Sequence, residues 1–381
     1  MKENSFVARR RFLKWAGLTA TIGPTFGFTS RQPNLGDSST QSKYQGVNKS
    51  FEAVKVSSDR VIRTVVGLRP YRASGFVVKS ERVNNKTIIH NYGHGGAGVT
   101  LSWGTAKLAV DLALQTKATT FAVLGCGVIG LSTARLLQRK GFQVTIYAKD
   151  LPPETTSNIA GALWFPTSVY EESKIDSKFL NQFDKACKIS HRIFQDYVGD
   201  NYGVWWIKNF SLGFAEEFPG GRELYPEIKD HRDPKIYFGF EYAQQFSTMM
   251  IEPAIYLNAV LWDFYLAGGK LHVRQFNTTR DITSLPESAI MNCTGLGSRK
   301  LFNDEELTPV KGQLSILLPQ PEIDYSYVAA MENNLLYMFP RKDGIVLGGT
   351  TEHGNWSIEP NVQESERILK GHSMISKSLG G

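Results

Sequence analysis

The sequence predicts an α/β protein built around a Rossmann-like dinucleotide-binding domain. Three consecutive features support this: an apolar run at 119–124 (TTFAVL), a glycine loop at 125–130 (GCGVIG), and a helical pattern at 131–140. A second strand-like run, FQVTIYA at 142–148, completes a βαβ unit. The chain has 381 residues, of which 41% are hydrophobic, so it is long enough for this domain and a second one.

The glycine loop has the spacing that a pyrophosphate requires. Gly125 permits the tight turn, Gly127 lets the backbone approach the phosphates, and Gly130 lets helix and strand pack closely. Val128 and Ile129 begin the helix, whose free N–H groups face the phosphates. The loop alone does not distinguish NAD from FAD.

An acidic residue is expected near the end of the second strand, where it binds a ribose hydroxyl. Asp150, with Lys149 beside it, is the candidate, one residue late. A solvated turn is the alternative interpretation of this pair.

Further motifs resemble the D-amino-acid oxidase family of FAD-dependent oxidoreductases. In that family a run similar to A-G-A-L-W passes the flavin ring, and a strand ending in N-C-T-G lies close to the cofactor. TPVKGQ (308–313) and GIVLGGTTEHGNWS (344–357) match its substrate-domain strands in order. The resemblance covers roughly 55–360 and implies FAD and a substrate domain with a large mixed or antiparallel sheet. The cofactor residues that it implies here are Ala160, Gly161, Ala162, Leu163, Cys293, Thr294 and Gly295.

Two motifs stand in an unexpected order. GLRPYR (67–72) and HNYGHGG (90–96) resemble the C-terminal part of the family, yet here they precede the glycine loop. The chain therefore resembles a circular permutant whose tail has moved to the front. Both glycine-rich loops then serve one cofactor, and the first one lines the flavin with Gly95, Gly96, Gly98, Val99 and Thr100.

These motifs predict the domain limits. We expect a signal peptide at 1–30 and a linker at 31–54. The FAD-binding domain is expected at 74–165 and 247–303, and the substrate domain at 55–73, 166–246 and 304–381.

The resemblance also implies the reaction. An amino acid is oxidised at its Cα–N bond to an imino acid, hydride passes to flavin N5, and O2 reoxidises the flavin to give H2O2. Arg69 matches the carboxylate clamp, Tyr337 the tyrosine that assists it, and Gly96 the glycine whose carbonyl accepts from the substrate amine. A guanidinium suits the clamp because its fork binds both carboxylate oxygens. Asn333 replaces a lid tyrosine of animal members, which puts the lid mechanism in doubt.

Each of these residues has a structural alternative. Arg69 could be a salt-bridged surface arginine, and Tyr337 an ordinary strand tyrosine. His94 is expected to make a structural hydrogen bond rather than act as a base. Aromatic residues between 200 and 246 are expected mainly to form core, although some could line the pocket: Trp205, Trp206, Tyr237, Phe238 and Tyr242.

The basic charge is concentrated at the N-terminus. Five basic residues and one acidic residue among the first fourteen hold +4 of the net charge of +7, so +3 remains for the rest. Arg9-Arg10-Arg11-Phe12-Leu13-Lys14 resembles a twin-arginine export signal, which predicts passage through that machinery to a bacterial periplasm. Cleavage of the signal or its retention as a tether is left open. The near-balanced remainder argues against nucleic-acid binding.

The three cysteines indicate neither a metal site nor a disulfide framework. Cys126 and Cys293 are expected to be small buried residues.

Several functions remain open. A D-amino acid with O2 is the favoured pair. Glycine, sarcosine or another secondary amine could replace the D-amino acid, and another acceptor could replace O2. A flavin-binding protein without turnover is a different class, and a nicotinamide enzyme is the least favoured.

Overall fold

The computed structural model describes residues 51–232, 238–331 and 334–379. The predicted signal peptide (1–30) and most of the predicted linker (31–54) lie outside this part of the chain. The described residues all belong to one compact unit. Val54 is only 2% exposed, and Phe51 packs against the same apolar cluster, so the folded part begins before the predicted end of the linker.

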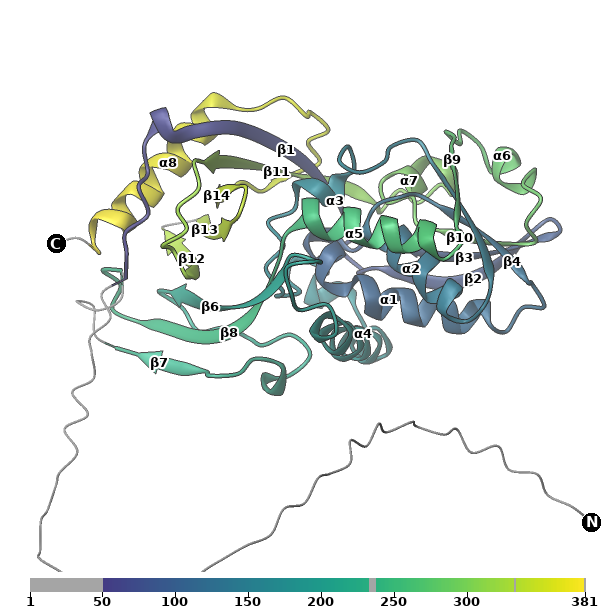
Figure 1. Ribbon diagram of the computed structural model, residues 1–381, viewed down its shortest axis with the longest axis horizontal. Helices are drawn as coiled ribbons and strands as arrows, with labels where there is room; N and C mark the ends of the chain where they lie inside the picture. The colour runs from purple at the N-terminus through teal and green to yellow at the C-terminus, as the bar shows by residue number, and fades with distance from the viewer. Residues whose placement is uncertain (1–50, 233–237, 332–333, 380–381) are drawn as a thin grey trace, which may run out of the picture. The chain divides into compact units, whose positions relative to one another are not determined.

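A six-stranded sheet carries the predicted dinucleotide-binding unit (Figure 1). Neighbouring strands are parallel throughout, except for the antiparallel edge pair β2–β3. In spatial order the strands are β2 (Val77–Val83), β3 (Lys86–Tyr92), β10 (Ala289–Asn292), β4 (Thr120–Leu124), β5 (Gln143–Ala148) and β9 (Lys270–Val273).

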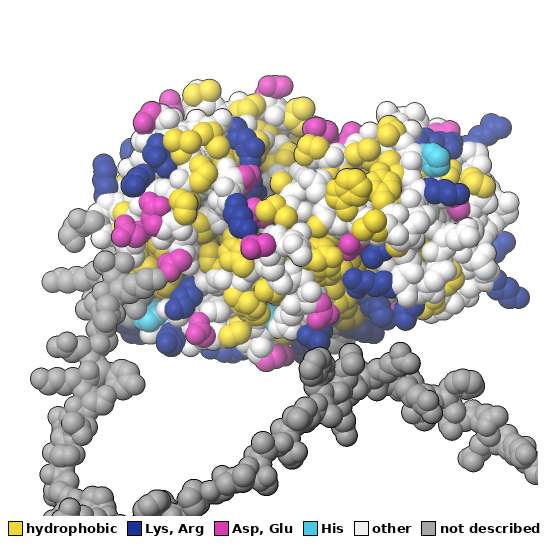
Figure 2. Space-filling model, viewed as in Figure 1, with side chains coloured by type: hydrophobic (Ala, Val, Ile, Leu, Met, Phe, Trp, Pro, Cys, Tyr) yellow, Lys and Arg dark blue, Asp and Glu magenta, His cyan; other side chains and the backbone are white. Residues whose placement is uncertain are grey.

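Alternation along the central strand β4 explains why both faces of this sheet are covered. Phe121 and Val123 point into a cluster shared with helices α1 (Gly98–Ala113), α2 (Val128–Arg139) and α5 (Pro253–Leu266). Ala122 and Leu124 point to the other face, against α6 (Thr279–Thr283) and α7 (Gly297–Leu301). Figure 2 shows apolar side chains gathered over α5, where Leu266 is 83% exposed.

A nine-stranded mixed sheet forms the second layer system, as predicted for the substrate domain. Its neighbouring strands are antiparallel, except that β12 and β6 run parallel. The strand order is β1 (Val61–Tyr71), β11 (Thr308–Leu317), β14 (Gly344–Gly348), β13 (Asn334–Arg341), β12 (Tyr325–Met331), β6 (Val204–Leu212), β8 (Ala243–Ile251) and β7 (Lys229–His231), with β15 (Glu352–His353) beside β11.

One face of the large sheet is buried against helix α8 (Val362–Lys377). Its apolar cluster joins Tyr327, Leu336 and Leu347 of the sheet to Ile368 and Ile375 of the helix. Successive strand residues point to opposite faces, so Tyr337 and Gly348, which follow Leu336 and Leu347, face away from α8.

Two elements cross the predicted domain limits. The predicted border between 246 and 247 falls inside β8, all of which belongs to the large sheet. Helix α4 (Ser177–Gln195), assigned by sequence to the substrate domain, packs on α1 of the other domain. The short helices α3 (Thr156–Ile159), η1 (Ser58–Arg60), η2 (Gly95–Ala97), η3 (Glu172–Lys174) and η4 (Arg222–Leu224) complete the described elements.

The beginning and end of the described chain are adjacent. The Ser376 hydroxyl on α8 donates to the carbonyl of Val54 at 2.5 Å, and the Tyr325 hydroxyl donates to the carbonyl of Glu52 at 2.7 Å. Within the described residues, none of the helices combines the length and apolar character that crossing a bilayer requires.

Candidate functional site

Four predicted cofactor segments lie at one edge of the six-stranded sheet. The loops that begin at Gly93, Cys293, Gly125 and Lys149 follow β3, β10, β4 and β5 in turn. These strands are neighbours and run parallel, so their carboxyl ends meet at the same edge. This edge is where open α/β sheets bind their ligands.

The glycine loop is as tight as its sequence predicts. Gly125 has a positive φ of 104°, and its N–H donates to the carbonyl of Tyr147 at 2.8 Å. A Cβ at Gly125 would lie 2.5 Å from the carbonyl oxygen of Cys293, and one at Gly130 would lie 2.0 Å from that of Gly125. Both glycines are therefore required by close backbone approach.

Ser157 of α3 was not among the predicted site residues, yet its hydroxyl lies at the N-terminus of α2. The Val128 N–H at the start of this helix donates to Ser157 Oγ at 3.0 Å. The neighbouring Asn158 has a buried side-chain NH2 without a partner among the described residues. The unpartnered Asn158 amide lies one residue from Ser157, beside the N-terminus of α2, and a donor at this place suits an anionic group, so the site fits the pyrophosphate of FAD. The hydroxyl-rich run Thr155-Thr156-Ser157 was the available signal.

The N-C-T-G loop is held by a buried polar network. Asn292 Nδ2 lies 3.0 Å from His90 Nδ1 and 3.0 Å from Ser298 Oγ, while Thr294 Oγ1 donates to Asn292 Oδ1 at 2.8 Å. Burial raises the pKa of the Cys293 thiol to about 12. Cys293 is thus a small buried wall residue, as predicted, and so is Cys126, which is 1% exposed.

The first glycine-rich loop lies against the 167–168 turn. The Gly96 N–H donates to the carbonyl of Ser168 at 3.0 Å. His94 is 1% exposed, its Nε2 lies 3.0 Å from Thr105 Oγ1, and burial lowers its pKa to about 3. The prediction of a structural hydrogen bond for His94 is confirmed.

The segment 160–163 joins the two sheets. The carbonyl of Ala160 accepts from Arg341 Nη1 of β13 at 3.2 Å, and the carbonyl of Ala162 accepts from the N–H of Ile251 of β8 at 3.0 Å. At its other end the segment continues from α3, whose Ser157 meets the glycine loop. It therefore links the pyrophosphate loop to the large sheet.

Arg69 lies on β1 between two cofactor segments. Gly67 and Tyr71 flank it on the same strand face: a Cβ at Gly67 would lie 3.1 Å from Ile159 of α3, and one at Gly95 would lie 3.1 Å from the Tyr71 ring. The strand face that carries Arg69 is thus bracketed by the segment that precedes Ala160 and by the Gly95 loop.

Arg69 and Tyr337 converge. Arg69 Nη2 lies 3.4 Å from the Tyr337 hydroxyl, and Nη1 lies 3.4 Å from the carbonyl oxygen of Thr350. Within the described part of the chain, no Asp or Glu oxygen lies within 4.0 Å of this guanidinium. A half-buried guanidinium without a carboxylate partner is free to bind one from solution.

The remaining predicted residues give a mixed outcome. Lys149 and Asp150 are exposed and paired with each other at 3.1 Å, the geometry of a solvated turn at the correct sheet edge. Trp205 packs in one cluster with Tyr337 and is a candidate to line the pocket, whereas Phe238 is 2% exposed in the core behind the sheet. Asn333 and Tyr237 lie outside the described residues.

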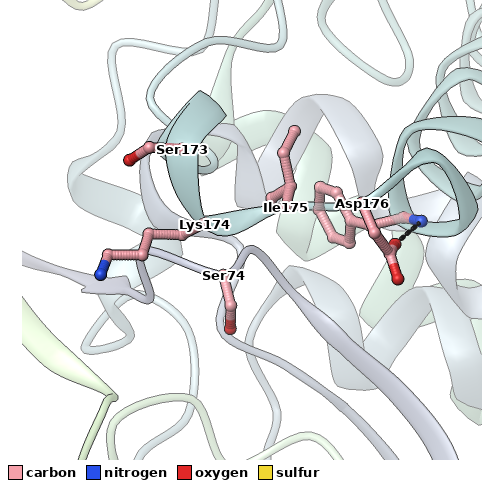
Figure 3. Close-up of a pocket in the computed structure, with 6 residues that line it drawn as sticks. Ser74, Ser173, Lys174, Ile175 and Asp176 are labelled. Atoms are coloured by element: carbon pink, nitrogen blue, oxygen red, sulfur yellow. Dashed lines mark hydrogen bonds between the residues drawn. The ribbon is translucent and has the colours of Figure 1, made fainter.

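A separate surface pocket of about 530 Å³ contains none of the predicted site residues (Figure 3). In the close-up, the Asp176 carboxylate turns toward the start of α4, where its Oδ1 accepts from the Phe179 N–H at 2.7 Å. Its charge is therefore used as a helix cap. In the described residues no three His, Cys, Asp or Glu side chains are placed to hold a metal ion.

Comparison with known proteins identifies the family. The model of the family described as FAD dependent oxidoreductase matches residues 6–112 and 120–374. D-amino-acid oxidase of Rubrobacter xylanophilus is 30% identical over 273 residues, which cover 68% of this chain and 78% of that protein. D-amino-acid oxidase of Dictyostelium discoideum is 32% identical over 265 residues, or 67% of this chain and 72% of that protein.

A solved structure shares the fold. Glycine oxidase from Geobacillus kaustophilus has a TM-score of 0.52 and 15% identity, covering 68% of this chain and 78% of that one. Together with the glycine loop, the family match excludes the nicotinamide alternative. The chain belongs to the family of FAD-dependent oxidoreductases, and its cofactor is FAD.

Proposed function

We propose that this protein is an FAD-dependent amino-acid oxidase that acts on D-amino acids. The observation that carries the proposal is the unpaired Arg69 guanidinium beside the Tyr337 hydroxyl, on the strand face bracketed by two cofactor segments. The substrate must therefore bear a carboxylate. The D-amino-acid oxidases among its relatives support the same substrate class.

The residues act by positioning. Arg69 and Tyr337 bind the substrate carboxylate, and the Gly96 carbonyl accepts from the substrate amine, so that the α-hydrogen is held toward the flavin. When bound, FAD would supply the redox chemistry as the acceptor of the substrate's hydride, with O2 as the final electron acceptor and an imino acid and H2O2 as the products. Burial lowers the pKa of His94, and its Nε2 lies 3.0 Å from the buried Thr105 hydroxyl, so we assign His94 a structural role rather than proton transfer.

A peroxide-release screen on flavin-loaded protein tests this function. D-amino acids, L-amino acids, glycine and N-methyl amino acids are compared for wild type and for Arg69→Ala. Arg82→Ala, an exposed arginine of β2, is the matched control. We expect activity with D-amino acids that Arg69→Ala abolishes and Arg82→Ala retains.

The alternatives give different results in the same screen. Preferential turnover of glycine or sarcosine would replace the D-amino-acid assignment. Flavin bleaching without peroxide would indicate a dehydrogenase, and a yellow protein that no substrate bleaches would indicate a binding function. Full activity in Arg69→Ala would contradict the site.

We propose further that the chain is circularly permuted relative to the family. The adjacency of Val54 and Ser376 supports this, because one short connection could join α8 to β1. The family match also divides at 113–119, between α1 and β4. A rearranged gene that joins residue 379 to residue 51 through a short linker and opens at 116–118 should give a folded, flavin-binding protein; an insoluble product would contradict the proposal.

The proposal for localisation rests on the N-terminal motif alone. The run from Arg9 to Lys14 supports export of the folded, flavin-loaded protein by the twin-arginine route. Replacing Arg9 and Arg10 with lysine should retain the protein in the cytoplasm. Unchanged export of that variant would refute the assignment.

A further inference from the structure

Two glycines lie directly beneath the carboxylate clamp. A Cβ at Gly348 would lie 2.1 Å from Cζ of Tyr337 and 2.5 Å from its hydroxyl oxygen. A Cβ at Gly312 would lie 2.4 Å from Nη2 of Arg69 and 2.6 Å from its Cζ. The side chains of Arg69 and Tyr337 thus lie against positions of the sheet that have no side chain.

Strand order explains why the glycines are at these positions. Tyr337 on β13 pairs with Gly348 on the neighbouring strand β14, and its ring lies over that residue. Arg69 comes from the other side, on β1, and its guanidinium lies over Gly312 of the neighbouring strand β11. Since β11 and β14 are themselves neighbours, the two side chains approach each other across them and end 3.4 Å apart.

The backbone of Gly348 is held by a buried histidine of α8. His372 Nε2 lies 3.2 Å from the carbonyl oxygen of Gly348, and Nδ1 lies 2.7 Å from the Tyr327 hydroxyl. A carbonyl can only accept, so the imidazole proton is on Nε2, and Nδ1 accepts from Tyr327. Gly348 is therefore fixed by a residue that is itself fully buried.

We propose that Gly312 and Gly348 are positioning residues that set the height of the carboxylate clamp above the sheet. This inference rests on the proposed function of Arg69 and Tyr337. A methyl group at either glycine lifts one side chain, separates the guanidinium from the hydroxyl, and weakens carboxylate binding. Gly348 acts through Tyr337 and Gly312 acts through Arg69, so the effects of the two substitutions on carboxylate binding can be measured separately.

Benzoate is a suitable probe, because it carries a carboxylate and no α-hydrogen. Its dissociation constant is measured from the change in flavin absorption, with kcat and KM for a D-amino acid in parallel. Gly348→Ala and Gly312→Ala should each weaken benzoate binding about tenfold, since added methyl groups in packed sites cost this much. Gly371→Ala on α8 is the control, because there the methyl meets the flexible end of Leu336.

The decisive comparison uses Tyr337→Ala as background, in which no ring lies over Gly348. There Gly348→Ala should change benzoate affinity less than twofold, whereas Gly312→Ala should keep its tenfold effect. An equal loss from Gly348→Ala with and without the ring would overturn the inference. So would single glycine variants that bind within twofold of wild type.

The design separates two failures. Benzoate binding that is insensitive to Arg69→Ala would refute the proposed function itself. Binding that depends on Arg69 and is insensitive to both glycines would refute only the glycine assignment. Thermal unfolding of each variant, and of the Tyr337→Ala/Gly348→Ala pair in which the contact is relieved, verifies that the fold is retained.

Discussion

The two arginines of the R-P-Y-R motif lie three residues apart and have opposite surroundings. Arg72 forms salt bridges with Asp304 at 2.9 Å and Glu306 at 2.7 Å, and it also donates to Ser74 and to the carbonyl of Gly75. Among the described residues, Arg69 reaches a hydroxyl and a carbonyl, each at 3.4 Å. Arg72 is saturated by its own chain, whereas Arg69 has donors to spare.

This contrast shows which arginine of the motif has a structural role and which one can bind substrate. Sequence shows two arginines of equal chemistry, and a charged residue of this kind is as often structural as functional. The pairing separates them: a guanidinium bound by two carboxylates stabilises the fold, and an unpaired one at a cofactor edge can bind an anion.

The largest expected effect comes from Arg69→Ala. Loss of two charge-assisted hydrogen bonds to the substrate carboxylate should lower kcat/KM about 1,000-fold, or about 4 kcal/mol. The thermal midpoint should stay within about 2 °C of wild type because no ion pair is broken. Peroxide-release kinetics and thermal unfolding check both parts. A fall in kcat/KM of less than tenfold would contradict the assignment of Arg69, rather than Arg72, to substrate binding.

Arg72→Ala should give the opposite result. Its side chain is 14% exposed and that of Asp304 is 12% exposed, so the substitution removes the ion-pair partner of a largely buried carboxylate, which keeps its hydrogen bond from the Tyr92 hydroxyl. We expect the free energy of unfolding to fall by about 3 kcal/mol, with KM unchanged in the folded fraction. Urea unfolding measures the loss. Wild-type stability, or a raised KM, would contradict the structural role.

Low pH should lower the stability of the fold through its buried histidines. Burial lowers the pKa of His372 from 6.5 to about 4, so the folded protein resists protonation that the unfolded chain accepts. The stability present above pH 6.5 is therefore lost as pH falls toward 4, by about 2 to 3 kcal/mol at pH 4.5 from His372 alone.

Urea unfolding between pH 4.5 and 7.5 measures this loss. His372→Gln, which keeps one donor and one acceptor, should reduce the dependence by this amount, while the part due to His94 remains. An identical pH profile in that variant would show that His372 is not responsible.

The smallest effect is expected from Tyr337→Phe. Removing the hydroxyl deletes one hydrogen bond to the carboxylate, worth about 1 kcal/mol, so kcat/KM should fall about five- to tenfold, mainly through KM. Arg69 still holds the substrate. A change confined to kcat would place Tyr337 in a step other than carboxylate binding.

Much of the nucleotide half could be predicted because its constraints are local. The turn at Gly125 and the close packing at Gly130 follow from residues next to them in sequence. The alternation of residues along β4 is also enough to predict which side chains point to each face of the sheet.

The remainder depends on contacts that sequence does not encode locally. Ser157 meets Val128 across 29 residues, and Gly348 matters only because Tyr337 folds over it. The predicted border at 247 fell inside β8, because the strand continues from Ala243 to Ile251 through its pairing with β6, a partner distant in sequence. Distance in sequence, rather than weak patterning, hid these features.

The most direct test of the account is a crystal structure of the FAD-loaded protein with benzoate. The account predicts the benzoate carboxylate within hydrogen-bond distance of both the Arg69 guanidinium and the Tyr337 hydroxyl, with its ring against the isoalloxazine. Benzoate bound elsewhere, or a flavin ring remote from Arg69, would contradict it.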